Sequence, residues 1–195
     1  MRRLSQYFAW RAIAVLAALS GCSSANPTLY TIAPINGAEQ YTAPKVIVLR
    51  QLGMERYLER LQIVRSSENY RLVVMENDWW GEPLSAMLTR VLVTELGQRL
   101  PQSTVISEAG AVSAAADATV TLNVLRLDEG ASGLILQAQA GVTFKRHAAP
   151  VLRDFRISVP LSAPGTLGEV AATSIAVGRL ADGLVAMLVA GPSGP

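Results

Sequence analysis

The stretch VVMENDWWGEPLSAMLTRVLVTEL, residues 73–96, decides the fold because two different periodicities meet within it. Its first residues belong to a run rich in Val, Met and Tyr that predicts a strand from Tyr70 to Glu76. From Pro83 onward, apolar residues recur at spacings of three and four, which predicts an amphipathic helix from Pro83 to Leu100. Pro83 suits a first helical turn, where its missing N–H breaks no bond, and Pro101 ends the helix.

The predicted helix has an apolar side and a polar side. Its apolar side is formed by Leu84, Met87, Leu88, Val91, Leu92, Leu96 and Leu100. The polar residues are expected elsewhere on the cylinder, and they are Ser85, Thr89, Arg90, Glu95 and Arg99. One side of this helix should therefore cover a sheet.

Strands are predicted on both sides of the opening stretch. The shorter ones are Thr28 to Ala33, Lys45 to Arg50, Leu61 to Arg65 and Thr104 to Ser107. The strand that ends at Arg65 and the strand that begins at Tyr70 should form a hairpin, because only Ser66-Ser67-Glu68-Asn69 separates them. Apolar and polar residues alternate over 118–124 and 136–144, which predicts two longer antiparallel strands, and Phe155, Ile157 and Val159 can add a third. The Ala-rich run at 108–118 is expected to be a loop or a small helix.

A second long helix is predicted from about Leu167 to Val189. Thr166 and Glu169 match a capping box, in which both side chains satisfy backbone donors at the helix start. Its buried stripe is expected to contain Leu167, Val170, Ala171, Ser174, Val177, Ala181, Leu184 and Leu188. The elements together predict an α+β fold, a mainly antiparallel sheet with two long amphipathic helices packed on one face and at least one crossover connection.

The first 22 residues have the layout of a secretory signal. Two Arg residues at the start precede an eight-residue apolar run, Ala12 to Leu19, which is too short to span about 30 Å of hydrocarbon. The last four residues, Leu19-Ser20-Gly21-Cys22, resemble the bacterial lipobox, which implies cleavage before Cys22 and acylation of that residue, with palmitate a typical chain. We therefore expect residues 1–21 to be a signal peptide, 22–28 a lipidated Cys and tether, and 29–195 one α+β domain. Ser23 after the Cys implies sorting to the outer membrane, on its periplasmic face. An ordinary signal peptide and a free thiol are the alternative.

The composition and the absence of known catalytic motifs argue against several classes of function. Of the 17 Lys and Arg residues three precede Cys22, which leaves 14 against 15 acidic residues and argues against a nucleic-acid partner. His147 is the only His and lies in a polar turn, so it is expected to be a solvated loop residue. No nucleophile elbow or phosphate-binding loop is found in the sequence. We expect no enzyme, no metal and no cofactor.

The opening stretch also carries a family resemblance. Trp80, Glu82, Pro83 and Leu84 match the Trp-x-Glu-Pro-Leu motif of the PqiC-type ABC-transport auxiliary lipoproteins, and "LYTI" at 29–32 and "KVIVL" at 45–49 occur in that family's order. The segment around Arg50 and Gln51 departs from the family pattern. The resemblance implies a component of an MCE-type lipid-transport system that supports membrane integrity. The partners that the resemblance implies are an MCE-domain protein, an inner-membrane permease and the outer membrane. The resemblance also implies assembly into a homo-oligomeric ring.

Three residues are candidates for contact with a partner or a lipid. Trp79 and Trp80 are adjacent, so they should point in opposite directions, with one in the core and the other available for contact. Glu82 is expected to be a first-turn carboxylate favoured by the helix dipole, with a ligand contact as the alternative. Two other functions stay open. One is regulation of a periplasmic enzyme such as a cell-wall synthase, and the other is direct lipid carriage in a pocket of this domain.

Overall fold

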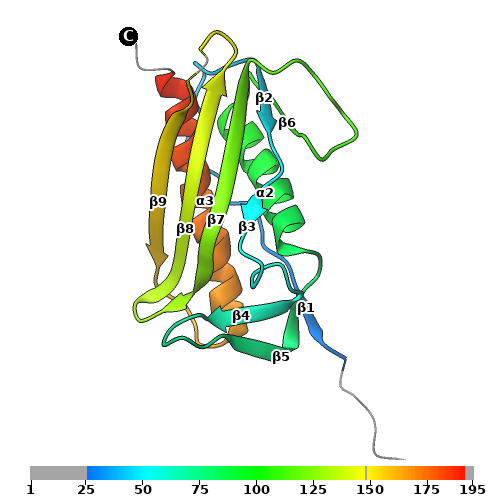
Figure 1. Ribbon diagram of the computed structural model, residues 1–195, viewed down its shortest axis with the longest axis vertical. Helices are drawn as coiled ribbons and strands as arrows, with labels where there is room; N and C mark the ends of the chain where they lie inside the picture. The colour runs from blue at the N-terminus through cyan, green and yellow to red at the C-terminus, as the bar shows by residue number, and fades with distance from the viewer. Residues whose placement is uncertain (1–25, 148, 192–195) are drawn as a thin grey trace, which may run out of the picture.

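The part of the chain that the structure describes forms two sheets and two long helices. A computed structural model describes residues 26–147 and 149–191 of the chain (Figure 1). The larger sheet has six strands in the order β6-β2-β7-β8-β9, with β3 also paired to β7. These strands are β2 (Val46–Leu49), β3 (Gly53–Met54), β6 (Thr104–Ser107), β7 (Ala118–Gly130), β8 (Gly133–Phe144) and β9 (Val151–Val159).

The long ladders of this sheet are antiparallel, as predicted. β7 pairs with β8 along its whole length, and β8 pairs with β9 from Leu134 to Val142. Gly133 closes the β7–β8 turn with a φ of 117°, and a Cβ there would overlap the backbone of Val159. On the other side, β2 runs parallel to both β6 and β7, so the path from β2 through the first helix to β6 is the expected crossover.

The smaller sheet is a finding that the sequence prediction lacked. It contains β1 (Thr28–Tyr30), β5 (Val73–Trp80) and β4 (Gln62–Ser66), with β1 parallel and β4 antiparallel to β5. The β4–β5 hairpin is confirmed, but its second strand begins at Val73 rather than Tyr70. Asn69 and Tyr70 have φ values of 55° and 60° and form the turn. β5 then extends through the aromatic pair to Trp80.

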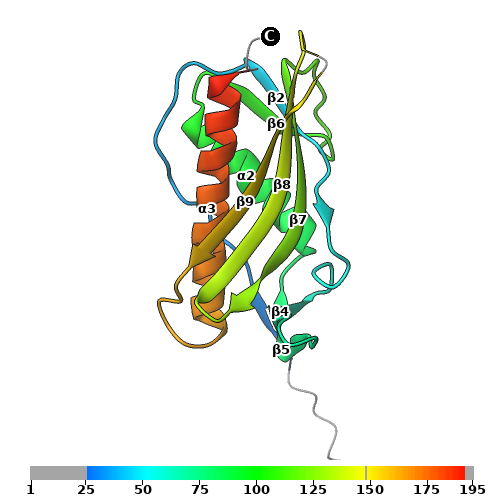
Figure 2. The same ribbon diagram turned by 60° about the vertical axis from the view of Figure 1, so that its left-hand side comes forward.

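Helices α2 (Leu84–Arg99) and α3 (Thr166–Ala190) pack beside each other on one face of the larger sheet (Figure 2). The core forms between this face and the apolar sides of the helices. α3 is long and apolar enough to cross a membrane, with a mean hydropathy of 1.5, but 67% of that window is buried inside the protein. It is a core helix of this fold.

Two details of the helix predictions are wrong. Leu167 is 72% exposed and Ala171 is exposed, so neither belongs to the buried stripe of α3. Glu95 and Arg99 are fully buried, although they were expected on the polar side of α2. Glu95 and Arg99 are buried by a third layer, because residues 31–43 cross the outer side of both helices on the way from β1 to β2 (Figure 2). We call residues 31–43 the N-terminal segment.

Candidate functional site

The chain enters the described part of the molecule at one end of the larger sheet. We call this the lower end; it holds β1, β4, β5, the β7–β8 turn and the start of α3 (Figure 1). Asn26 is the first described residue there and is exposed. Cys22 and the predicted signal peptide lie outside the described residues. The β8–β9 turn lies at the opposite end, which we call the upper end.

The two tryptophans of β5 have different environments. Trp80 is 5% exposed and belongs to the core, as expected for one of the pair. Trp79 is half-buried on the other face of the small sheet, where its register partners are Leu29 of β1 and Gln62 of β4. The Trp79 indole Nε1–H donates to the carbonyl oxygen of Glu76 at 2.9 Å. Trp80 therefore anchors the strand, and Trp79 leaves part of its ring at the surface.

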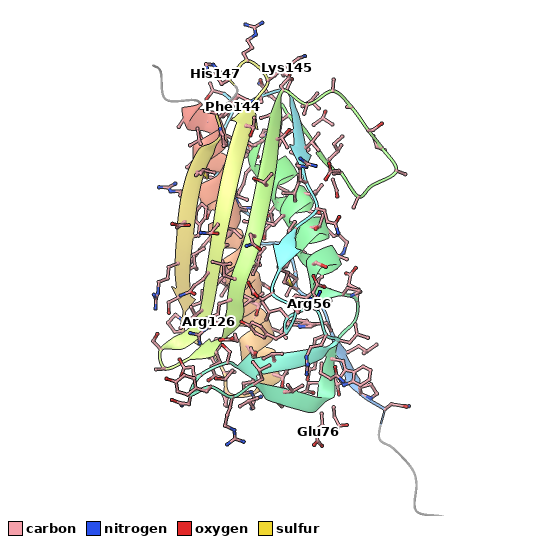
Figure 3. All side chains as sticks on the ribbon, viewed as in Figure 1. Arg56, Glu76, Arg126, Phe144, Lys145 and His147 are labelled. Atoms are coloured by element: carbon pink, nitrogen blue, oxygen red, sulfur yellow. The ribbon has the colours of Figure 1, made fainter. Side chains whose placement is uncertain are left out.

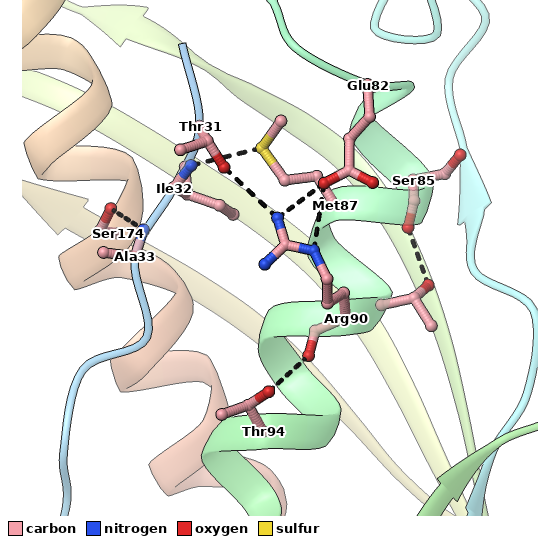
Figure 4. A network of polar contacts seen from close by, with 10 residues as sticks. Thr31, Ile32, Ala33, Glu82, Ser85, Met87, Arg90, Thr94 and Ser174 are labelled. Carbon is pink, nitrogen blue, oxygen red and sulfur yellow. Dashed lines mark hydrogen bonds and ion pairs between the residues drawn. The ribbon is translucent and has the colours of Figure 1, made fainter.

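Glu82 connects two parts of the chain through Arg90. The helix begins after Pro83 and has no acidic residue in its first turn, so the expected role of Glu82 at the helix dipole is wrong. Its Oε1 instead accepts from Arg90 Nη2 at 2.6 Å and from Nε at 3.1 Å (Figure 4). Arg90 Nη2 also donates to Thr31 Oγ1 at 3.3 Å. The motif residue Glu82 thus orients an arginine that holds the start of the N-terminal segment.

The N-terminal segment is bound to both helices along its length. The backbone N–H of Ala33 donates to Ser174 Oγ of α3 at 3.2 Å, and that of Ile32 faces Met87 Sδ of α2 at 3.4 Å (Figure 4). Ile32 is 2% exposed and is part of the core. Further along, the N–H of Gln40 donates to the carbonyl oxygen of Arg99 at 2.7 Å. The segment therefore closes the outer side of the helix pair.

A polar network around a buried arginine lies under this segment, and Asp182 at its outer edge is 57% exposed. Arg99 is 1% exposed, and its Nε donates to Asp182 Oδ1 at 2.6 Å. Its Nη1 donates to the carbonyl oxygen of Ile35 at 2.9 Å, and its Nη2 to that of Gly178 at 3.1 Å. Glu95 Oε1 accepts from the N–H of Ile35 at 2.7 Å, and burial raises the pKa of Glu95 while the Ile35 N–H and the Arg99 charge lower it. One arginine joins α2, α3 and the N-terminal segment.

A second polar cluster lies at the lower end. Arg65 Nε is 3.7 Å from Glu169 Oε2 and 4.0 Å from Glu129 Oε2. Glu169 is 3% exposed, and burial raises its pKa to about 7 although the Arg65 charge opposes the shift. Thr166 donates its hydroxyl to Asp78 of β5 instead of capping α3, whose N-cap is Gly165, so the predicted capping box is wrong. These contacts join the start of α3 to the small sheet.

The upper end has an open and basic surface. A hollow of about 600 Å³ is lined by Asp117, Phe144, Lys145, Arg146 and His147. Figure 3 shows Phe144, Lys145 and His147 at this end of the molecule. His147 is exposed, as expected, and its backbone N–H donates to the carbonyl oxygen of Phe144 at 2.9 Å. Asp117 Oδ2 accepts the N–H of Val46 and so positions β2. Within residues 26–147 and 149–191, no group of three His, Cys, Asp or Glu side chains is placed to bind a metal ion.

Comparison with known proteins gives relatives in sequence and in fold. Two curated relatives, the intermembrane transport lipoproteins PqiC of Escherichia coli (strain K12) and Shigella flexneri, are each 28% identical over 95 residues. That alignment covers 46% of this chain and 51% of each relative, so the chain spans about half the length of the curated relatives it matches.

The fold is also found in solved structures. A crystal structure of an uncharacterized protein superposes with a TM-score of 0.70, at 15% identity over 83% of this chain and 98% of the other. Protein XCC0632 from Xanthomonas campestris superposes with a TM-score of 0.66, at 16% identity over 81% and 92% of the two chains. At these identities the likeness concerns the fold alone. A family model for the ABC-type transport auxiliary lipoprotein component matches residues 28–185, from the first strand to the last helix, and the chain therefore belongs to that family.

Proposed function

We propose that this protein is a non-enzymatic, outer-membrane lipoprotein subunit of an MCE/ABC-type lipid-transport system. Residues 1–21 are its signal peptide, Cys22 carries the acyl chains, residues 22–28 form the tether, and residues 29–195 form one domain in the periplasm. The family match over residues 28–185 is the observation that carries the proposal. The partial likeness to PqiC, an intermembrane transport lipoprotein, supports the MCE-domain protein and the inner-membrane permease as partners.

The position of the two ends supports this arrangement. Cys22 is four residues before Asn26, and four extended residues span at most about 14 Å, so the lower end stays close to the anchoring membrane. The upper end then faces the periplasm with the exposed side chains of Lys145, Arg146 and His147. We propose that the upper end docks on the transport conduit. Confinement to one leaflet raises the effective concentration of a docking partner, so a small interface is sufficient.

The three candidate contact residues have separate roles in this proposal. Trp79 and Glu82 have side chains that are partly accessible, and they can contact a lipid or a partner, whereas Trp80 supports them from the core. A homo-oligomeric ring is part of the same proposal. Analytical ultracentrifugation of the protein in detergent measures it, and a monomer throughout would remove the ring from the proposal.

Two measurements in the native cells test the function. Mass spectrometry of the mature protein should find Cys22 acylated, and Cys22→Ala should remove the protein from the outer-membrane fraction. A photo-crosslinking residue placed at Lys145 should capture the MCE-domain protein, whereas the same residue at Asp154 on β9 should not. An unmodified sulfur at Cys22 contradicts the anchor. Capture of a cell-wall synthase from Lys145 contradicts the transport role and favours regulation of that enzyme.

A further inference from the structure

The lower end carries a concentration of exposed apolar side chains. The structure describes eleven large apolar residues that are exposed, and six of them lie on β1, on or directly before the β4–β5 hairpin, and at the start of α3. They are Leu29 at 63%, Leu61 at 40%, Tyr70 at 108%, Leu72 at 45%, Val73 at 46% and Leu167 at 72%. Exposed apolar residues scattered singly need no explanation, but residues that gather at one end of a molecule indicate a contact surface.

The turn of the β4–β5 hairpin carries two of these residues, Tyr70 and Leu72. The left-handed backbone at Asn69 and Tyr70 turns the chain so that the Tyr70 side chain is fully exposed. The exposed residues Arg71 and Leu72 follow directly. A tyrosine, an arginine and a leucine in sequence combine an apolar body with polar tips, which is the composition that suits the boundary between lipid headgroups and acyl chains.

The tether brings this surface to a membrane. Asn26 lies at the same end as the small sheet, which extends across the lower end from β1 to the hairpin (Figure 1). Cys22 can be at most about 14 Å from Asn26, as the four intervening peptide units allow no more. An acylated Cys22 has its chains in the bilayer, so the point where the chain enters the lower end, Asn26, is held within about that distance of the headgroups. This step rests on the proposed function.

We infer that the β4–β5 hairpin, with Leu29 and the exposed part of Trp79, rests on the phospholipid bilayer that anchors Cys22. Leu29 and Trp79 are register partners on neighbouring strands, so they extend the apolar surface from the hairpin toward the tether. The contact fixes the orientation of the domain and directs the upper end away from the membrane. It adds to the acyl anchor and does not replace it, because single interfacial residues bind only weakly.

A fluorescent label tests the contact in the full lipidated protein. Cys22 is the only cysteine of the chain, so Leu72→Cys provides a single free thiol once Cys22 is acylated. The protein is labelled there with an environment-sensitive NBD fluorophore and reconstituted in vesicles of phosphatidylethanolamine and phosphatidylglycerol. Val112→Cys is the matched control, because Val112 is 67% exposed in the loop before β7, away from the lower end. Tyr70→Cys places the same label at a second position, where the native side chain is fully exposed.

The expected result is a shift of the emission at positions 72 and 70 to shorter wavelength, with quenching by nitroxide-labelled lipid. The label at position 112 should show neither effect. Labels at 70 and 72 that behave like the label at 112 overturn the inference, and so does protection from iodide without quenching by the lipid, which indicates that a second copy covers the hairpin. Flotation of the protein with the vesicles reports the anchor separately. Loss of flotation is a failure of the proposed function, whereas flotation without quenching is a failure of the membrane contact alone.

Discussion

Replacement of Arg99 by Met should destabilise the protein more than any other change of a single charge pair described above. The substitution keeps most of the apolar stem but removes the guanidinium that joins α2, α3 and the N-terminal segment. Glu95, which is 0% exposed, then has a buried carboxylate without its cation. The carbonyl oxygens of Ile35 and Gly178 also lose their donor. Removal of one partner from a buried ion pair costs about 3–5 kcal/mol, and we expect a loss in that range.

The measurement is urea unfolding of the protein lacking residues 1–22, followed by circular dichroism. For a chain of this size, the expected loss in the free energy of unfolding corresponds to a fall in Tm of roughly 6–20 °C. Arg50→Met is the control, because the Arg50–Glu108 pair has the same chemistry at 3.1 Å with both side chains about half exposed, at 56% and 44%. Such surface pairs contribute about 0–1 kcal/mol.

A second substitution separates the charge from the packing. Glu95→Gln in the Arg99→Met background removes the unpaired buried carboxylate, so the double variant should recover part of the lost stability. The reasoning is refuted if Arg99→Met loses no more stability than Arg50→Met. It is also refuted if Glu95→Gln makes the Arg99→Met variant still less stable.

Three further results are expected. The raised pKa of Glu169, about 7 in the folded protein against 4.5 as the reference, means that its contribution to stability is fully present below pH 4.5 and is lost as the pH rises through 7. Glu169→Gln should therefore stabilise the protein at pH 8 by up to about 3 kcal/mol and have little effect at pH 4.5. Urea unfolding at both pH values measures this, and an equal gain in stability at the two pH values would contradict the prediction. Trp80→Ala should lower the free energy of unfolding by about 3–5 kcal/mol, because Trp80 is buried in the core. Trp79→Ala, at a half-buried site, should lower it by clearly less. Equal losses in the two variants would contradict the assignment of Trp80 as the core anchor. Gly37→Ala should destabilise the protein, because the added Cβ would overlap the guanidinium of Arg99. The rate of hydrogen exchange at the Ile35 amide should rise in this variant. An unchanged exchange rate would contradict a clash at the Arg99 network.

Local sequence patterns are sufficient to predict most of the helices and strands. The spacing of apolar residues located both helices to within about two residues, because their periodicity is long and regular. The alternation in β7 and β8 identified a hairpin whose register is set by the same alternation. The opposite orientation of Trp79 and Trp80 followed from strand geometry alone.

The remaining features depend on contacts between distant parts of the chain. Nothing in the spacing of Glu95 and Arg99 on α2 distinguishes a solvated i,i+4 pair from a buried one, and the N-terminal segment that buries them lies about 60 residues earlier, at Ile35. The sequence pattern at Thr166 predicts a local cap, but Asp78, 88 residues away, accepts the hydrogen bond of its hydroxyl. Arg90 follows Glu82 by eight residues, and only the folded contacts of its guanidinium with Glu82 and Thr31 show its role.

The route of the N-terminal segment has a mechanical consequence. In the proposed arrangement, a force on the tether between the membrane and the domain acts first on the three-residue β1, and then on Thr31, Ala33 and Ile35 in turn. Each of these holds the chain to a different side chain, so a load detaches them one after another and never all at once. Detachment of Ile32 would open the interior between the helices. Under the proposed function, the strength of these contacts therefore limits the force that a docked partner can apply before the domain begins to unfold.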